Sequence, residues 1–260
     1  TWHLTIRSAV TQKWTHRYEL KPGRWVFAPT DEAKKTGVRI KRSVASHWKP
    51  PGFYYHLRNG GHVAAVRSHE SSRFFLRADL DDFFGRVNRS RVTRCLKHWF
   101  SYAEAREMAS ESVVKRPGET AFVLPYGFVQ SPILASLALD KSKLGSLLRS
   151  LHGGREFTVS VYVDDIIISG NDEARLKEVA IQLDHVASVA QFPLSTGKTE
   201  GPASGVTAFN IELSHRMLRI RDARLSSLRN DYQATESAYC KAGIVSYIES
   251  VNPDQVAEVT

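Results

Sequence analysis

Two short runs of β-branched residues enclose a pair of adjacent carboxylates within residues 159–169. The runs 159–163 and 166–169 have the composition and length of strands. The break between them, Asp164-Asp165, predicts a hairpin turn, although Asp-Asp is a weaker turn signal than Asn-Gly. Neighbouring carboxylates repel each other, and a bound cation such as Mg²⁺ would remove that repulsion. An isolated Asp-Asp pair is more often a solvated turn, so the interpretation needs a further carboxylate.

A third carboxylate occupies a similar place upstream. Residues 74–78 predict a strand with Asp79 at its end, and residues 90–102 carry apolar side chains at helical spacing. Aspartates at the ends of neighbouring strands would hold two cations between them. Paired cations about 3.5–4 Å apart stabilise the attacking and leaving oxygens in polymerases and nucleases. The sequence therefore predicts a metal site formed by Asp79, Asp164 and Asp165.

Three motifs in this order resemble those of the reverse transcriptases, and the bacterial retron, group II intron and phage-defence types look most similar. The motifs are Asp-Leu-Asp-Asp-Phe-Phe (79–84), Leu-Pro-Tyr-Gly-Phe-Val-Gln-Ser-Pro (124–132) and Tyr-Val-Asp-Asp (162–165). A four-residue motif alone arises often by chance, whereas three motifs in order are far more specific. The resemblance weakens towards both ends of the chain.

The resemblance implies an α+β fold of the right-hand polymerase type, with fingers, a palm of antiparallel sheet backed by helices, and a short helical thumb. It divides the chain into fingers with a basic N-terminal region (1–72), palm (73–90), a helical connection (91–122), palm with the hairpin (123–222) and thumb (223–260). It also implies two Mg²⁺ ions, with Mn²⁺ as a substitute, held by the three aspartates.

Roles within the first motif follow from the same resemblance. Asp79 matches the aspartate that ligates both cations, and the backbone at Leu80 and Asp82 matches the segment that cradles the nucleotide triphosphate. Phe84 matches the bulky residue beneath the sugar of the incoming nucleotide, where a ring leaves no room for a 2′-OH. The resemblance therefore implies selection of deoxynucleotides, while Phe83 is expected to be a core residue.

The second motif carries one departure from the family. Tyr126 stands where the family usually has Gln, which affects how the base and sugar are handled. Gly127 lacks a side chain, so its backbone can approach the nucleotide or the template-primer. Ser131-Pro132 predicts a helix start, with Ser as N-cap and Pro at the first helical position.

Further candidate residues are basic. Lys198 matches a family lysine near the triphosphate, where a cation stabilises the leaving pyrophosphate. Residues 53–57 and 62–67 around the Arg-Asn-Gly-Gly turn predict a hairpin, and the resemblance makes Arg58 and Arg67 triphosphate contacts. His62 and His69 lack ligand spacing and are expected to be structural.

Three downstream segments are predicted from their patterns. Residues 172–190 have helical spacing, residues 208–213 and 217–220 form a second hairpin, and residues 223–260 are helical. The resemblance places the primer grip at this second hairpin and the thumb at the last segment.

Charge indicates a polyanionic partner. The net charge is +9, and residues 1–60 contain twelve Lys and Arg against three acidic residues. Such cations beside aromatic rings suit nucleic-acid binding, although some of the rings must belong to the core. The aromatic residues are Trp2, Trp14, Trp25, Trp48, Phe53, Tyr54 and Tyr55. No apolar run or signal-peptide pattern indicates a membrane partner, and the cysteine usage favours the cytoplasm.

The hypothesis is an RNA-directed DNA polymerase that extends a DNA or RNA primer on an RNA template with dNTPs. A structured non-coding RNA or a partner protein would complete its short thumb. Three alternatives remain open at this point: an RNA-dependent RNA polymerase, an untemplated or protein-primed nucleotidyl transferase on the same palm, and a non-catalytic nucleic-acid-binding module.

Overall fold

The structure is a computed structural model that describes residues 12–260. It divides into two compact units, Thr1–Lys49 with Phe84–Ala138 and Pro50–Phe83 with Leu139–Thr260. Trp2 and Arg7, which belong to the predicted basic and aromatic region, lie outside the described residues. Both units combine helices with antiparallel sheets, which confirms the predicted α+β class.

The first unit combines helices with two small antiparallel ribbons, and its helix α4 packs against both α1 and α3. Its strands are β1 (Trp14–Lys21), β2 (Arg24–Pro29), β4 (Val114–Lys115) and β5 (Phe122–Val123). Its helices are α1 (Asp31–His47), α3 (Arg89–Leu96) and α4 (Tyr102–Ser112), with α5 (Ser131–Asp140) up to Ala138. The side chain of Thr30 caps α1, and a reciprocal Ser101–Glu104 capping box begins α4.

A small apolar cluster holds the ribbons of the first unit together. Phe27, Val114 and Phe128 form its centre, and Trp14 and Trp25 pack against them. These two tryptophans therefore serve the core, as do the buried Trp48 of the same unit and Phe53 and Tyr54 of the second unit. Because these rings pack in the protein core, most of the aromatic residues predicted to stack on bases are not available for that role.

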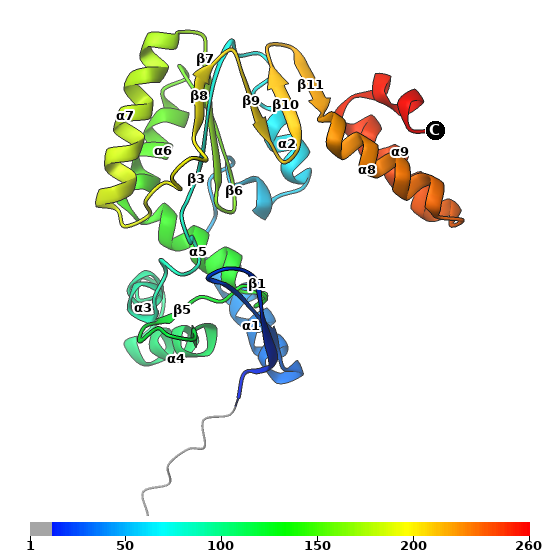
Figure 1. Cartoon of the computed structure of the whole chain (residues 1–260). Helices are drawn as coiled ribbons and strands as arrows, with labels where there is room; N and C mark the ends of the chain where they lie inside the picture. The colour runs from blue at the N-terminus through cyan, green and yellow to red at the C-terminus, as the bar shows by residue number, and fades with distance from the viewer. Residues whose placement is uncertain (1–11) are drawn as a thin grey trace, which may run out of the picture. The chain divides into compact units, whose positions relative to one another are not determined.

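The second unit is built on a four-stranded antiparallel sheet in the order β6-β7-β3-β8 (Figure 1). The strands are β3 (Phe74–Asp79), β6 (Thr158–Tyr162), β7 (Asp165–Gly170) and β8 (Glu200–Ala203). Helices α6 (Lys143–Gly153) and α7 (Glu173–Val189) cover one face of this sheet. The predicted strand at 74–78, the hairpin at 159–169 and the helix at 172–190 are confirmed.

Strand alternation divides β3 between the two faces of the sheet. Leu76 and Ala78 are buried on one face, while Phe75, Arg77 and Asp79 share the other. Phe75 packs into an apolar cluster with residues from the other end of the chain. The second face is therefore apolar at the start of β3 and charged at its end.

The apolar cluster around Phe75 includes a three-stranded sheet and the C-terminal helices. These elements are β9 (Gly205–Ala208), β10 (Ile211–Ser214), β11 (Met217–Ile220), α8 (Asp222–Ala234), α9 (Ala238–Val251) and η2 (Pro253–Glu258). The predicted helices in residues 223–260 and the β10–β11 pairing are confirmed. The run 208–213 is not one strand, because Phe209 and Asn210 both have positive φ and form a tight turn between β9 and β10.

Two predicted elements are wrong. Residues 53–67 form a 3-10 turn, η1 (Tyr55–Leu57), and a helix, α2 (Gly61–Arg67), in place of a hairpin. Gly60 and Gly61 have positive φ and lead into α2, so the glycine pair starts a helix. The helix predicted over 90–102 ends early: α3 stops at Leu96, residues 97–101 are not helical, and α4 begins only at Tyr102.

The helix predicted at Ser131-Pro132 is α5, but it begins at Ser131 itself, one residue before the predicted first helical residue Pro132, and the Ser131 hydroxyl does not cap it. Ser131 is buried, and its Oγ has no hydrogen-bond partner among the described residues. Separately, within residues 12–260 no helix combines the length and apolar content that a membrane crossing requires.

Candidate active site

The turn of the β6–β7 hairpin presents the Tyr-Val-Asp-Asp motif. Tyr162 pairs with Asp165, which leaves Val163 and Asp164 as the two turn residues. Val163 has φ 59°, a left-handed conformation that is unusual for a β-branched residue. The Asp164 carbonyl accepts a hydrogen bond from the Leu80 N–H (2.8 Å), which ties the turn to the end of β3.

Asp79 and Asp165 are direct partners across the antiparallel β3–β7 pair. Both side chains lie on the same sheet face, and Asp79 is 7% exposed. Carboxylates directly opposite each other repel, and burial strengthens that repulsion. The two aspartates that the sequence separated by 86 positions (165 − 79) are therefore neighbours that require compensating positive charge.

Arg77 supplies this charge to Asp165. It precedes Asp79 by two residues on β3, so its side chain shares the charged face. Its Nε and Nη2 donate to Asp165 Oδ1 at 3.0 and 2.7 Å, and its Nη1 donates to Glu200 at 3.2 Å. Glu200 in turn accepts the Thr207 N–H at 2.8 Å. A four-strand polar network thus fixes the orientation of Asp165.

Lys198 and Ser195 donate hydrogen bonds to Asp79, as Arg77 does to Asp165. Lys198 Nζ donates to Asp79 Oδ1 at 2.9 Å, and the Ser195 hydroxyl donates to the same oxygen. The Ser195 N–H also donates to the Asp79 carbonyl at 2.7 Å. Lys198, the lysine predicted from the resemblance, therefore contacts Asp79, one of the three predicted metal ligands.

The pKa of Asp165 reflects these neighbours. Burial raises its pKa above the ordinary value for an aspartate, and the charge of Asp79 raises it further. The charge and hydrogen bonds of Arg77 oppose this rise, with a smaller contribution from Lys198. Arg77 is therefore the main group that favours ionised Asp165.

Two amides of the predicted triphosphate cradle are already hydrogen-bonded within the protein. The Leu80 N–H donates to Asp164, and the Asp81 N–H donates to the Pro193 carbonyl at 2.8 Å. Asp82 has φ 45°, so the chain turns sharply after β3. Phe83 is buried against Phe192, with ring centroids 5.7 Å apart, and this confirms its expected place in the core.

Phe84, Tyr126 and Gly127 belong to the first unit. The rings of Phe84 and Tyr126 meet edge-on with centroids 4.7 Å apart, and the Arg24 guanidinium lies 4.8 Å from the Tyr126 ring. Gly127 has φ 101°, and a Cβ there would stand 2.3 Å from the Phe27 carbonyl oxygen. The close backbone approach at Gly127 is therefore made to β2 of the same unit.

The two arginines expected to contact the triphosphate have partners within the second unit. Arg58 donates to the Gly52 carbonyl at 2.7 Å and stacks on Tyr55 at 4.7 Å. Arg67 donates to the Ser250 carbonyl at 2.7 Å at the end of α9, where a cation also complements the helix dipole. His69 is buried between serine hydroxyls, as expected of a structural histidine.

A polar hollow of about 490 Å³ adjoins Asp165 in the second unit. Its lining residues are Arg77, Asp165, Glu200, Thr207, Phe209, Asn210 and Arg221. The hollow therefore places arginine side chains beside the β6–β7 hairpin and the β9–β10 turn.

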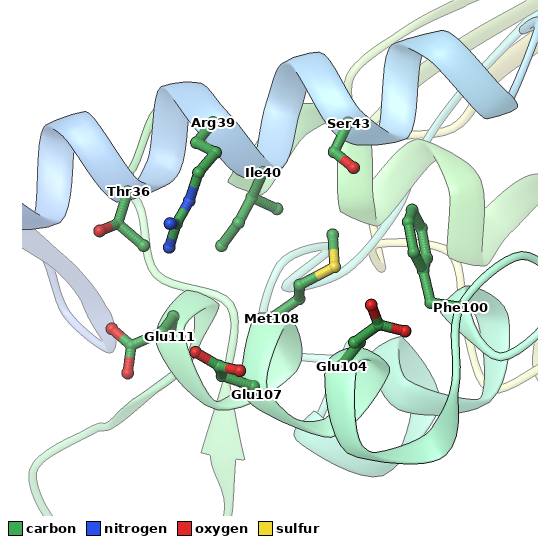
Figure 2. Close-up of a pocket in the computed structure, with 9 residues that line it drawn as sticks. All are labelled: Thr36, Arg39, Ile40, Ser43, Phe100, Glu104, Glu107, Met108 and Glu111. Atoms are coloured by element: carbon green, nitrogen blue, oxygen red, sulfur yellow. The ribbon is translucent and has the colours of Figure 1, made fainter.

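The first unit has a separate hollow of about 290 Å³ between α1 and α4 (Figure 2). Ile40, Met108 and Phe100 supply apolar side chains, and Glu104, Glu107, Glu111 and Arg39 supply charged ones. Glu104 is engaged in the capping box, and Glu111 lies 3.7 Å from Lys13. None of the residues predicted from the motifs line this hollow, so it is not part of the candidate site.

The donor set suits a hard divalent cation, because three carboxylates stand at two adjacent strand ends. Among residues 12–260, however, no group of three or more His, Cys, Asp and Glu side chains is arranged to hold a metal. The carboxylates of Asp79 and Asp165 point to Lys198 and Arg77 instead. These contacts are made to Oδ1 of each carboxylate, so a bound cation would compete with Lys198 and Arg77 at those oxygens.

Sequence reasoning missed Arg77, Ser195 and Glu200. Only Arg77 could have been found from the sequence, because a residue two positions before a strand-end aspartate lies on the same face of the strand. Ser195 and Glu200 come from segments whose approach to β3 depends on the sheet order.

Comparison with known proteins identifies the family. The model of the family described as "Reverse transcriptase (RNA-dependent DNA polymerase)" matches residues 20–216, more than half of the chain. The Gag-Pol polyprotein of Walleye dermal sarcoma virus is 37% identical over 67 residues, which is 25% of this chain and 4% of that protein.

Solved structures show the same fold at low sequence identity. Telomerase from Candida albicans, in complex with a fragment of telomeric RNA, has a TM-score of 0.53 and 10% identity over 87% of this chain. The foamy viral protease-reverse transcriptase in complex with RNA/DNA hybrid has a TM-score of 0.50 and 16% identity over 88% of this chain. The match covers 46% and 26% of those two chains. These likenesses show a right-hand polymerase fold.

Proposed function

The chain belongs to the reverse transcriptase family, and we propose that it is an RNA-directed DNA polymerase that adds deoxynucleotides to a primer 3′-OH. The observation that carries the proposal is the pairing of Asp79 with Asp165 across β3 and β7, next to the turn that holds Asp164. Opposed carboxylates, one buried and one partly buried, are unfavourable for stability alone. Their contacts with two cationic side chains show that the site attracts positive charge, which supports a role in binding cations.

Reverse transcriptases generally use divalent metal ions. We assign two, Mg²⁺ with Mn²⁺ as a substitute, to Asp79, Asp164 and Asp165. Bound there, they would supply activation of the 3′-OH and charge neutralisation at the α-phosphate. Lys198 would leave Asp79 when the site is loaded, and its ammonium group would then stabilise the leaving pyrophosphate.

The deoxynucleotide preference rests on Phe84. Its ring is held at the edge of the Tyr126 ring, so its position is fixed by a second aromatic side chain. A fixed ring beneath the sugar excludes a 2′-OH better than a mobile one does. The same contact explains how Tyr126 replaces the family's usual Gln, because it gives this residue a supporting role.

The nucleic-acid partners are an RNA template and a DNA or RNA primer, as the basic composition supports. We assign residues 1–72 to the fingers, 73–90 and 123–222 to the palm, 91–122 to the helical connection and 223–260 to the thumb. The two-helix thumb is short, and a structured non-coding RNA or a partner protein would complete the grip on the duplex.

The test is incorporation of each dNTP and each rNTP with Mg²⁺, with and without RNA template and primer. Asp164→Asn should lower template-dependent dNTP incorporation by roughly 1000-fold, because it removes a metal ligand and leaves the fold intact. Asp184→Asn, the same change at an exposed position of α7, is the matched control and should retain activity. Normal extension by folded Asp164→Asn protein would refute the proposal.

The other outcomes identify the alternatives. Uptake without template would indicate an untemplated or protein-primed nucleotidyl transferase on the same palm. Uptake of rNTPs in preference to dNTPs would indicate an RNA polymerase. RNA binding without any uptake would indicate a non-catalytic module.

The biological setting that we propose is bacterial phage defence or a retron-like element in the cytoplasm, and it rests on the motif resemblance. Phage plaque counts on bacteria that express the protein test it. Protection that disappears with Asp164→Asn would support the setting, and equal plaque counts for the two proteins would oppose it.

A further inference from the structure

The turn before Asp164 carries a backbone conformation that requires support. Val163 has φ 59°, and its branched Cβ makes the left-handed region unfavourable. Two-residue hairpin turns favour positive φ at their central positions, but Gly, Asn and Asp adopt it more readily than a β-branched residue. A change of φ at Val163 would rotate the Val163–Asp164 peptide and redirect the Asp164 side chain.

His56 makes the contact that holds this turn. Its Nδ1 accepts a hydrogen bond from the Val163 N–H at 2.9 Å. His56 comes from a segment far away in the sequence, on the 3-10 turn η1. All of these residues belong to the second unit.

The position of His56 is itself fixed by backbone pairing. The Val161 N–H donates to the Phe53 carbonyl at 2.8 Å, and Tyr54 forms a parallel bridge with Val161. The segment before His56 therefore runs along the outer edge of β6. The imidazole also meets the Tyr162 ring edge-on, with centroids 5.8 Å apart.

The chemistry of the ring agrees with an acceptor role. An Nδ1 that accepts an N–H must be unprotonated, so the neutral ring carries its proton on Nε2. Burial lowers the pKa of His56 to about 4, and its hydrogen bond with the Val161 backbone acts in the opposite direction. The ring is therefore neutral near pH 7.

A second hydrogen bond holds the other side of the same turn. The Asp164 carbonyl accepts the Leu80 N–H at 2.8 Å. The peptide between Val163 and Asp164 is thus flanked by one bond to η1 and one bond to the end of β3. Loss of the His56 bond would leave the turn held by the Leu80 bond and by the Tyr162–Asp165 pairing, with the Val163 amide unrestrained.

We propose that His56 is a positioning residue for the catalytic turn, and that its Nδ1 holds the Val163 amide and thereby the backbone of Asp164 next to the paired Asp79 and Asp165. The proposal rests on the proposed function for its catalytic consequence. The hydrogen bond to a strained turn one residue from Asp164 is the feature that distinguishes His56 from the other histidines of the second unit.

The test compares His56→Leu with His56→Asn. In Asn, Oδ1 is attached to Cγ as Nδ1 is in His, so the acceptor is retained; Leu has a similar branch without an acceptor. His56→Leu should lower kcat for dNTP incorporation roughly 10-fold with little change in KM and should speed amide hydrogen exchange of Val163 by a similar factor. His56→Asn should stay within about 3-fold of wild type in both measurements.

His152→Leu is the matched control. The His152 ring lies edge-on to the Phe53 ring, with centroids 5.2 Å apart. Its contacts among residues 12–260 do not include the Val163–Asp164 turn, so Val163 exchange and kcat should not change. Wild-type behaviour of His56→Leu would overturn the proposal, as would equal losses in the Leu and Asn variants.

A measurement on wild-type protein covers the case in which the variants do not fold. The ¹⁵N shifts of the His56 ring should show a protonated Nε2 and an unprotonated Nδ1 near pH 7, and protonated Nδ1 would overturn the proposal. The ring tautomer of His56 and the amide exchange of Val163 can both be measured on protein that has no polymerase activity. Absent incorporation by wild type would therefore refute the proposed function alone, while these two readouts would still decide the hydrogen bond.

Discussion

Removal of Arg77 should destabilise the second unit in a pH-dependent manner. Arg77→Met keeps most of the aliphatic stem and removes the bonds to Asp165 and Glu200. The side chains of Arg77 and Asp165 are 19% and 14% exposed, so the pair is intermediate between surface and buried ion pairs. Surface pairs contribute about 0.2–1 kcal/mol, and breaking a buried pair costs about 3–5 kcal/mol. We expect a loss of about 2 kcal/mol near neutral pH.

The pH dependence follows from the carboxylate that loses its partner. Burial and Asp79 raise the pKa of Asp165, and Arg77 is the main group that opposes them. Without Arg77 the folded-state pKa of Asp165 rises further. A raised folded-state pKa in an aspartate destabilises the fold above that pKa, and the cost disappears as pH falls towards the unfolded value of about 3.9. The deficit of Arg77→Met should therefore be largest near pH 7 and should shrink on acidification.

Thermal unfolding of the metal-free protein measures this effect. A loss of about 2 kcal/mol corresponds to a Tm decrease of roughly 4–8 °C for a protein of this size. Scans at about pH 7.5 and about pH 5 would compare the deficits. Arg175→Met is the matched control, because Arg175 also pairs with two carboxylates, Glu156 and Glu178, but is 52% exposed. Its Tm should fall by less than about 2 °C at either pH.

Two results would refute this reasoning. One is an equal decrease in Tm for Arg77→Met and Arg175→Met, which would mean that burial of the Arg77–Asp165 pair does not add to its contribution to stability. The other is a deficit that stays constant or grows on acidification, which would mean that Asp165 ionisation is not the source of the loss.

Two further substitutions test the first unit. Phe84→Val should raise the incorporation of rNTPs relative to dNTPs by at least about 10-fold, because the smaller side chain opens space beneath the sugar. Competition between the two nucleotide types measures this ratio. An unchanged ratio would show that Phe84 does not exclude the 2′-OH. Gly127→Ala should lower the unfolding free energy by about 1–3 kcal/mol, because φ is 101° and the added Cβ would stand 2.3 Å from Phe27. Gly243→Ala in α9, where a Cβ meets nothing within 4 Å, should instead stabilise by about 0.5–1 kcal/mol, and denaturant melts distinguish the two.

Much of the second unit could be predicted because its signals are local. The β-branched runs around Asp164-Asp165 form β6 and β7, and the strand predicted before Asp79 is β3. The apolar spacing of α7 also required no tertiary information. In each case side-chain periodicity and backbone preference agree with the final packing.

The segment 53–67 shows where local signals fail. Its glycine-marked turn between two apolar runs is typical of a hairpin, yet α2 forms after Gly60 and Gly61. Short apolar runs do not distinguish strand from helix, and the two adjacent alanines, Ala64 and Ala65, favour the helix. Ala65 and Val66 are fully buried, so packing decides the outcome.

The amino-acid sequence by itself determined which carboxylates this protein would present and that strand ends would carry them, because strand propensity and turn position depend on neighbouring residues. Only the tertiary structure decided which groups surround those carboxylates. Arg77 meets Asp165 because β3 lies beside β7, and Lys198 meets Asp79 because the segment before β8 returns to the end of β3. His56 reaches Val163 because its segment runs along β6. Electrostatic and hydrogen-bond partners depend on distance in space, and strand order, which no local pattern specifies, sets that distance.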